Sequence, residues 1–258
     1  MVVYDEAFFA GEGKSGLDSA RVVVPLVFQF GDFKSVLDVG CGVGGWLKVF
    51  EELGVFDLVG VDGPWIENKK LMIHKEQIFT RNLAEPLVLN RAFDLVISLE
   101  VAEHLPLEKA QIFVNNLVSH GDVVLFSAAI PGQTGMHHLN KQWPSFWVEL
   151  FDRCGFVVVD CLRREIWDNP NVAWWYAQNI MFYVNRTKLA EYPKLQAHVW
   201  EKQKQLNIVH PGLLKFILAN PDVSLGESIK LFWKALDARL YRFLTKSQEN
   251  TWEKSGKD

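Results

Sequence analysis

Short apolar runs alternate along most of the chain with segments in which apolar residues recur every three or four positions. The runs are typical of buried strands, and the periodic segments are typical of amphipathic helices. The predicted strands are residues 35–39, 57–62, 93–100, 122–129, 156–162 and 178–184, and the predicted helices are residues 43–54, 105–121 and 142–155. Strands that alternate with helices form a doubly wound, mainly parallel sheet with helices on both faces. We therefore predict an α/β fold of this class.

The pattern changes after Asn185, where strand-like runs disappear. Residues 190–209 and 224–246 show only helical periodicity. We therefore predict two parts of the chain. They are a main domain over residues 1–185, which begins with a helical lid segment at 1–34, and a helical extension over residues 186–258.

The last predicted helix carries basic side chains beside its apolar stripe: Lys230, Lys234, Arg239, Arg242 and Lys246. A basic amphipathic helix can lie on an anionic membrane surface. Such a stripe also packs on its own domain or forms a homodimer, with the charges in solvent. Peripheral membrane contact and a homodimer are therefore both open for this segment.

Composition narrows the possible partners and the compartment. The 258 residues suit one large domain with an appendage, and 49% hydrophobic with 22% charged residues is ordinary for a globular protein. A net charge of −4 counts against broad nucleic-acid binding, so no nucleic-acid partner is expected. No apolar run is long enough to cross a bilayer, and the first residues lack the pattern of a signal peptide. Three cysteines without metal or redox spacing favour a reducing, cytoplasmic location.

A glycine-rich turn joins the strand at 35–39 to the helix that follows, with glycines at 40, 42, 44 and 45. In a parallel sheet, ligands bind at the carboxyl ends of the strands. Glycines there permit positive φ angles and let the backbone approach a ligand, while the following helix directs free N–H groups to the same place. The turn is therefore a candidate ligand cradle.

Two carboxylates indicate the kind of ligand. Asp38 lies in the strand just before the turn, where a fixed negative charge disfavours a pyrophosphate and favours a cation. Asp62 ends the next strand, where a carboxylate can accept hydrogen bonds from both hydroxyls of a ribose. An amine at one end and a ribose in the middle describe S-adenosylmethionine.

The segments that carry these residues resemble the motifs of one enzyme family. VLDVGCGVGGW is similar to the first motif of class I S-adenosylmethionine-dependent methyltransferases, LVGVDGPW to the second, FDLVISLEVAEHL to the fourth, and DVVLFSAA to the fifth strand. The resemblance covers about residues 35–130 and implies a seven-stranded sheet with an antiparallel last strand. Residues 130–156 and 167–184 resemble a bacterial subgroup associated with glycan or polysaccharide biosynthesis.

The resemblance also implies the residues that hold this cofactor. Its methionine part is placed against Asp38, Gly40 and Gly42, and its ribose against Asp62 with the adjoining Gly63. Its adenine is placed beside Asn82 and Leu83, although many relatives have Asp where this chain has Asn, and a purely structural role stays open for Asn82. Glu100 is placed near the amine and the sulfonium.

A second group of polar residues follows the strand at 93–100, in the order Glu100, Glu103 and His104. Three roles are open for it: a divalent metal site for Mg, Mn or Zn, a general base at His104, or a loop satisfied by its own hydrogen bonds. Plant-type small-RNA 2′-O-methyltransferases and some ubiquinone-pathway O-methyltransferases carry a similar E-x-x-E-H and a later histidine. That resemblance implies His137 or His138 as the further ligand, with Glu100, Glu103, His104 and His138 as the candidate set.

The loop after the strand at 122–129 supplies candidates for the methyl acceptor. His104, His137 and His138 are the candidate catalytic bases. Asn140 and Gln142 can contact hydroxyl groups. Trp143 and one of the pair Trp174 and Trp175, with Trp174 chosen, can stack on a sugar or a planar ring, whereas Trp147 lies on an apolar helix face and is expected in the core. The alternative for each is an ordinary capping or core role.

Oxygen nucleophiles need a base to remove their proton, so the histidines favour O-methylation. We expect an S-adenosylmethionine-dependent methyltransferase acting on a hydroxyl of a sugar or glycoconjugate. A phenol or quinone-like small molecule is the first alternative acceptor, and RNA 2′-hydroxyls come third because the chain is acidic. A non-catalytic adenosyl-binding protein is the alternative from another functional class.

Overall fold

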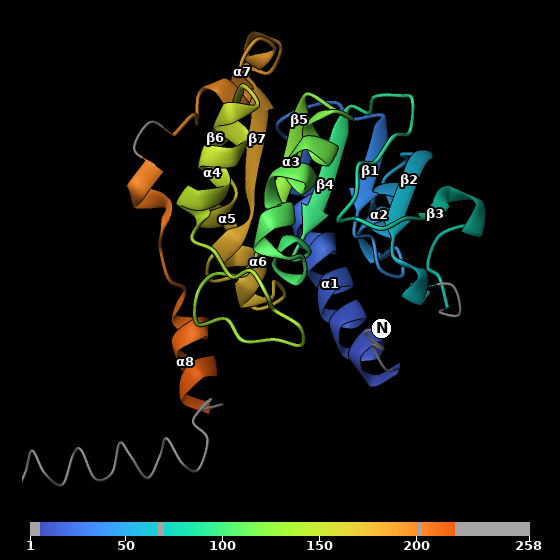
Figure 1. Ribbon diagram of the computed structural model, residues 1–258. Coiled ribbons are helices and arrows are strands. Elements are labelled where there is room, and N and C mark those ends of the chain that lie inside the picture. Colours follow the sequence, from blue (N-terminus) through green and yellow to red (C-terminus); the bar gives the residue numbers. More distant parts are fainter. Residues whose placement is uncertain (1–5, 67–69, 201–202, 220–258) are drawn as a thin grey trace, which may run out of the picture. The chain divides into compact units, whose positions relative to one another are not determined.

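The computed structural model describes residues 6–66, 70–200 and 203–219 (Figure 1). The chain divides into two compact units, Met1–Lys215 and Phe216–Asp258. Of the second unit, only residues 216–219 are described, so the predicted helix at 224–246 and its basic side chains lie outside the described residues.

The first unit contains a seven-stranded sheet. Its strands are β1 (Ser35–Val39), β2 (Asp57–Asp62), β3 (Ile78–Thr80), β4 (Leu95–Leu99), β5 (Val123–Ser127), β6 (Phe156–Val159) and β7 (Met181–Asn185). Their order across the sheet is β3-β2-β1-β4-β5-β7-β6. All the pairings are parallel except those of β7, which runs antiparallel to both β5 and β6. The predicted fold class, with an antiparallel last strand, is confirmed.

The α-helices are α1 (Glu6–Val27), α2 (Gly45–Glu52), α3 (Ala110–Val118), α4 (Pro144–Arg153), α5 (Arg163–Ile166), α6 (Trp174–Asn179), α7 (Pro193–Gln196) and α8 (Pro211–Ala219). Short 3-10 helices cover Pro64–Ile66, Lys75–Gln77, Ala102–His104, Leu107–Lys109, Leu189–Glu191 and Gln203–Leu206. Within the described parts of the chain, no helix combines the length and the apolar character needed to cross a membrane.

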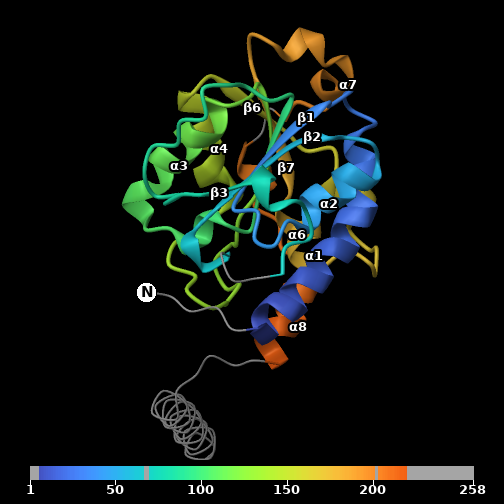
Figure 2. The same ribbon diagram turned by 90° about the vertical axis from the view of Figure 1, so that its right-hand side faces the viewer.

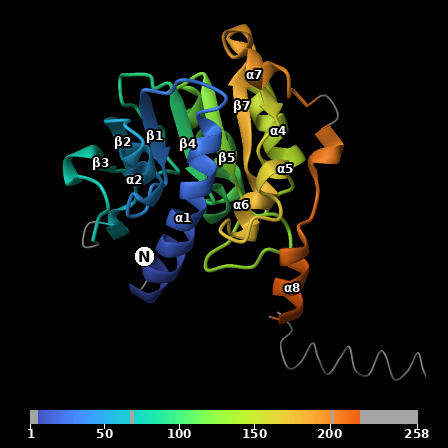
Figure 3. The same cartoon turned by 180° about the vertical axis from the view of Figure 1, so that it is seen from behind.

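The sheet separates two apolar cores, because alternate side chains along each strand point to opposite faces. Val36 of β1 and Ile97 of β4 face one core, which α1, α2 and α6 cover. Leu37 and Val96 face the other core, which α3 and α4 cover. Figures 2 and 3 show this three-layer arrangement from the side and from behind.

All the strands predicted from the pattern are present, and β3 is an addition. It has only three residues, of which Phe79 is exposed, so it shows no apolar run. The strands β4, β5 and β6 end earlier than predicted, because the chain turns away at the carboxyl edge of the sheet to form the loops described below.

The predicted domain boundary at residue 185 differs from the division seen in the structure. Leu195 and Leu206 are fully buried in the two cores, and the Trp200 N–H donates a hydrogen bond to the Val158 carbonyl of β6. Residues 186–215 therefore complete the first unit. The predicted lid segment also differs in part, because Val23 and Val27 place the second half of α1 in the core.

Candidate functional site at the carboxyl edge of the sheet

The turn between β1 and α2 is held in conformations that favour glycine. Gly40 has a φ angle of +92°, and a Cβ atom at this position would lie 2.3 Å from the Val101 side chain. Gly42 and Gly44 also have positive φ angles, of +52° and +86°. The Gly40 N–H donates to the Val61 carbonyl at 2.7 Å, which ties the turn to β2. A side chain at Gly40 would therefore be excluded by both the backbone and the packing.

Asp62, at the end of β2, organises the backbone of this turn. Its two carboxylate oxygens accept hydrogen bonds from the N–H groups of Gly42 and Gly63, each at 2.6 Å. Burial raises the pKa of Asp62 to about 6, although these hydrogen bonds and one from the Trp65 side chain oppose the shift. The Trp65 ring packs so closely on Gly63 that a Cβ atom there would lie 2.1 Å from it. Trp65 is therefore a site residue that the sequence did not single out.

Asp38 is a carboxylate on β1 that is only 3% exposed. Burial, and then the charge of Asp62, raise its pKa well above the usual value. A buried carboxylate is costly to ionise unless a cation or a donor reaches it. The amine of S-adenosylmethionine would supply both, and the acceptor position of Asp62 that Gly42, Gly63 and Trp65 leave open suits a ribose hydroxyl. The residues of this turn therefore fit the cofactor.

Asn82 and Leu83 follow β3 on the same edge of the sheet. Asn82 is exposed, and its Oδ1 accepts a hydrogen bond from the Ala84 N–H at 3.1 Å. Leu83 is buried in the core beneath α3 and α4. A role for both residues beside the adenine stays a prediction.

Glu100 follows β4 with a φ angle of +57°, which is strained for a residue with a side chain. Its N–H donates to the carbonyl and hydroxyl oxygens of Ser127 at 3.0 and 3.1 Å. Its carboxylate accepts hydrogen bonds from the side-chain amides of Gln133, at 2.6 Å, and Asn179, at 3.1 Å. Gln133 and Asn179 were not predicted from the sequence, because no local pattern marks an amide that pairs with a distant carboxylate.

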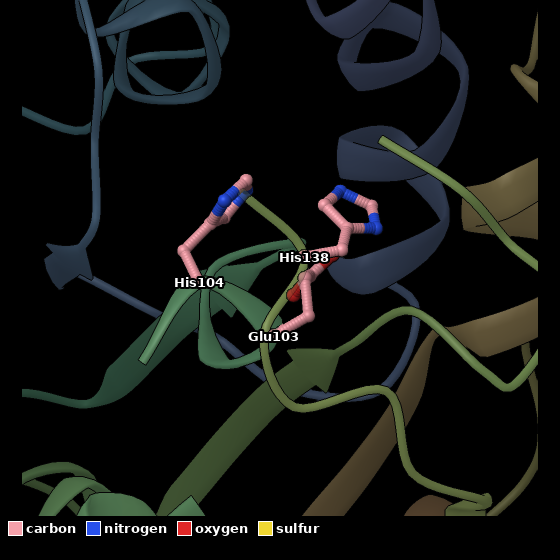
Figure 4. A group of neighbouring side chains, drawn as sticks. All are labelled: Glu103, His104 and His138. Carbon is pink, nitrogen blue, oxygen red and sulfur yellow. The ribbon is translucent and has the colours of Figure 1, made fainter. Parts of the chain in front are cut away.

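Glu103, His104 and His138 form one group, in which one possible ligand atom from each lies within 4.8 Å of the others. Figure 4 shows the two imidazole rings side by side with Glu103 beneath them. The ring centres are 4.9 Å apart, and the planes are nearly perpendicular. Glu100 lies outside this group, since both of its oxygens accept hydrogen bonds from amides.

The three members of this group are uncharged or costly to charge. Glu103 is fully buried, and neither of its carboxylate oxygens has a hydrogen-bond partner in the part of the chain that the structure describes. Burial and then the charge of Glu100 raise the pKa of Glu103 well above the usual value. Burial and then His138 lower the pKa of His104 to about 4, and burial also lowers the pKa of His138. Both imidazoles are therefore neutral at physiological pH.

A backbone carbonyl selects the tautomer of His138. The Nδ1 atom lies 3.0 Å from the carbonyl oxygen of Gln133. Because a carbonyl only accepts hydrogen bonds, the proton is on Nδ1 and the lone pair is on Nε2. His138 therefore has the form of a base or a metal ligand at Nε2.

The other predicted acceptor residues divide into two groups. Asn140 is buried, and its Oδ1 accepts a hydrogen bond from Gln142 at 3.0 Å. The Asn140 backbone N–H donates to the Glu103 carbonyl at 2.9 Å, which places this part of the loop beside the histidine group. His137 is exposed with a φ angle of +59° and lies outside the group of possible ligands.

The predicted tryptophans are partly accessible. Trp143 is 37% exposed and precedes α4, so its indole is open to a ligand. Trp174 is half-buried, because its side chain packs against Gly212. Trp147 is buried in the core as expected. Stacking of Trp143 or Trp174 on an acceptor stays a prediction.

The sequence model of a methyltransferase domain matches residues 18–166, which include the turn, Asp62 and the Glu103–His104 pair. The chain belongs to this family of methyltransferases. It is a class I enzyme that uses S-adenosylmethionine as the methyl donor. Among curated proteins, no sequence matches this enzyme.

Solved structures share the fold of this methyltransferase at low sequence identity. DesVI from Streptomyces venezuelae is 16% identical, with a TM-score of 0.51 over 71% of this chain and 99% of its own. An O-methyltransferase family protein from Burkholderia thailandensis is 14% identical, with a TM-score of 0.51 over 71% of this chain and 60% of its own. Magnesium protoporphyrin IX methyltransferase from Synechocystis PCC 6803, with bound S-adenosylhomocysteine, is 17% identical, with a TM-score of 0.48 over 72% of this chain and 90% of its own.

Proposed function

We propose that this methyltransferase methylates a hydroxyl group of a sugar or glycoconjugate. The observation that carries the proposal is the neutral pair of imidazoles, His104 and His138, at the carboxyl edge of the sheet. A hydroxyl is a weak nucleophile until a base accepts its proton. A histidine that stays uncharged at neutral pH has the free lone pair that this step needs.

The residues of the site form two groups, one for the cofactor and one for the acceptor. S-adenosylmethionine supplies an electrophilic methyl group when it is bound. Asp38 and Asp62 hold its amine and ribose, and Glu100 lies at the end of β4 on the side of the sulfonium. His138 accepts the acceptor's proton at Nε2, because its Nδ1 donates to Gln133. His104 lies against His138 and helps to keep the region free of positive charge.

The sugar part of the proposal depends on the loop between β5 and α4. Asn140 and Gln142 pair their side-chain amides in the stretch of loop whose backbone bonds to Glu103, and amides hydrogen-bond to hydroxyls. Trp143 offers an exposed indole next to them, and indole faces stack on the C–H face of sugars. Together these features favour a polyhydroxylated acceptor, and they agree with a place in polysaccharide biosynthesis.

The proposal is tested with S-adenosylmethionine that carries a labelled methyl group and a panel of sugars, nucleotide sugars, glycolipid headgroups, phenols and oligonucleotides. We expect transfer to sugar hydroxyls, and we expect it to fall at least about hundredfold in His138→Gln, as for loss of a general base. His137→Gln is the matched control and keeps the activity. Transfer only to phenols or RNA would reject the sugar acceptor, and tight donor binding without transfer to any acceptor would favour a non-catalytic role.

A second candidate function of the same group is divalent metal binding, and the unpartnered Glu103 carboxylate favours it. Glu103 with the two imidazoles offers one oxygen and two nitrogen ligands, a set that suits Mn or Zn better than Mg. A bound metal would lower the pKa of the acceptor hydroxyl and orient it.

Calorimetry with Mn²⁺, Zn²⁺ and Mg²⁺ separates the two candidates. Metal binding that disappears in His104→Ala and survives in Glu100→Gln is expected if the three-residue group is the site. Because Glu103 must release its proton to bind, the affinity is also expected to rise with pH. No heat with any of the ions would leave His138 as an unassisted base.

A further inference from the structure

The carboxylate of Glu100 is closed into a ring of hydrogen bonds with two amides. Gln133 Nε2 donates to Glu100 Oε2 at 2.6 Å, and Asn179 Nδ2 donates to Glu100 Oε1 at 3.1 Å. Asn179 Nδ2 also donates to Gln133 Oε1 at 3.1 Å, which completes the ring. The three residues come from the end of β4, the loop after β5 and the end of α6. The ring therefore joins three parts of the site that are far apart in the sequence.

The amide of Asn179 has a fixed orientation within this ring. Its Oδ1 accepts a hydrogen bond from Gln178 Nε2 at 3.1 Å, so its Nδ2 faces Glu100 and Gln133. Gln178 is itself fully buried, and its Oε1 accepts the backbone N–H of His210 at 2.9 Å. The Gln178 carbonyl accepts a hydrogen bond from Arg163, which forms a buried ion pair with Asp160. A flipped Asn179 amide would lose all its partners, so the ring has one arrangement.

Gln133 connects this ring to the histidine group. Its side chain belongs to the ring, while its backbone carbonyl accepts the hydrogen bond from His138 Nδ1. The His138 ring also fits closely over Gly135, where a Cβ atom would lie 2.3 Å from Nε2. The position of Gln133 therefore sets both the tautomer and the place of the His138 ring.

We propose that Asn179 and Gln133 are positioning residues, whose amides clamp the end of β4 to the loop that carries His138. The clamp keeps the Gln133 carbonyl at His138 Nδ1 and so keeps the lone pair on Nε2. Glu100 is its anchor, and residues 206–210 support it through Arg163 and Gln178. The catalytic consequence rests on the proposed function, whereas the effect on the His138 tautomer does not.

The test is nuclear magnetic resonance of the histidine rings, with ¹⁵N-labelled protein at neutral pH and a chelator to exclude metals. The His138 signals are assigned by their loss in His138→Gln. In the wild-type protein we expect His138 as the single Nδ1–H tautomer. In Asn179→Asp, an oxygen replaces the amide nitrogen that donates to Glu100 and Gln133. The His138 ring is then expected to exchange between its two tautomers, so its two nitrogen signals should move toward their average position.

Asn185→Asp is the matched control. Asn185 is the last residue of β7, whereas Asn179 precedes the first residue of this strand. The side-chain amide of Asn185 donates a hydrogen bond to the Asp122 carboxylate at 2.6 Å. This variant loses an amide–carboxylate hydrogen bond without touching the clamp, so the His138 signals are expected to stay as in wild type. A melting curve shows which variants are folded. Gln133→Leu keeps the backbone carbonyl and replaces Asn179→Asp if that variant does not fold.

The outcomes separate the clamp from the proposed function. Wild-type His138 signals in both folded clamp variants, or an equal change in Asn185→Asp, would overturn the clamp. A changed tautomer in the clamp variants supports it, even if His138→Gln leaves methyl transfer intact and so rejects the base. If the proposed function also holds, transfer in the clamp variants is expected to fall about tenfold through kcat, with the donor affinity changed less, as for loss of one hydrogen bond to a charged group.

Discussion

The two halves of the carboxyl edge are built in different ways. The half after β1 and β2 contains the glycine turn, Asp38 and Asp62 within residues 38–63, and it is made largely of backbone N–H groups and glycines. The half after β4 and β5 holds the histidine group, and its parts range from Glu100 to Asn179, joined by side-chain amides. The first half is a local structure, and the second depends on long-range packing.

Both halves bury two carboxyl groups, but their surroundings differ. The charge of Asp62 raises the pKa of Asp38, which suits an amine-bearing cofactor. The charge of Glu100 likewise raises the pKa of Glu103, but Glu103 also lies beside two neutral imidazoles, which suits a hydroxyl or a metal ion. The carboxyl edge of the sheet therefore carries two groups of buried polar residues that are built separately.

The largest effect is expected for Gly40→Ala in the local half. The new Cβ would overlap Val101 and would force a φ angle of +92° on alanine. Backbone strain and overpacking together are expected to lower the free energy of unfolding by about 4 kcal/mol, measured by urea denaturation. Gly54→Ala is the matched control, because Gly54 has a φ angle of +93° with nothing within 4 Å of its Cβ position. An equal loss in both variants would show that contact with Val101 contributes nothing.

Removal of the Asp62 carboxylate should weaken the cofactor site without disturbing the histidine half. In Asp62→Ala, the affinity for S-adenosylhomocysteine is expected to fall about hundredfold, as for loss of a hydrogen-bonded charged acceptor, measured by calorimetry. Asp57→Ala is the control, since Asp57 is exposed at the other end of β2, and it should leave the affinity unchanged. Unchanged binding in Asp62→Ala would move the ribose away from this carboxylate.

Asp62 and His104, one group from each half, should respond to pH with opposite signs. Asp62 has a pKa of about 6 when folded, above its usual value, so between about pH 4 and 6 the folded protein binds more protons at this group. Its contribution to the free energy of unfolding therefore falls as pH rises, by up to about 1.4 kcal/mol per pH unit. His104 has a pKa of about 4 when folded, below its usual value, so the unfolded chain binds more protons there and this contribution rises with pH.

Urea denaturation across pH 4–7, with a chelator and without cofactor, measures these signs. Relative to wild type, Asp62→Asn should make stability rise more steeply with pH, and His104→Gln should make it rise less steeply. Changes of the same sign in both variants would contradict the opposite pKa shifts of Asp62 and His104.

The smallest effect is expected for Asn82→Ala. The variant loses the hydrogen bond that the exposed Asn82 side chain accepts from the Ala84 N–H, which is worth about 0.5–1.5 kcal/mol. We expect a slightly lower melting temperature and an affinity for S-adenosylhomocysteine within about threefold of wild type. Asn82→Asp keeps the acceptor oxygen and should restore the stability. A tenfold weaker affinity in Asn82→Ala would instead place this side chain on the cofactor.

The sequence predicted the sheet well, because buried parallel strands are apolar runs long enough to be recognised. It missed β3, whose three residues show no such run, and it placed the domain boundary too early at residue 185. The segment from 186 to 215 shows helical periodicity without a strand-like run, so the sequence grouped it with the helical extension. The burial of Leu195 and Leu206 and the hydrogen bond from Trp200 to β6 show that it belongs to the first unit.

Within the site, the sequence by itself determined the glycine turn, Asp38 and Asp62, and hence the cofactor. The steric freedom of glycine and the position of a carboxylate at a strand end are local properties, so a short segment is enough to predict them. The tertiary structure alone decided that His138 rather than His137 joins His104. It also decided that Glu100 lies outside this group and is hydrogen-bonded to Gln133 and Asn179. The physical reason is that a buried amide or imidazole takes its partner from whatever long-range packing brings within about 3 Å, and no local pattern records that choice.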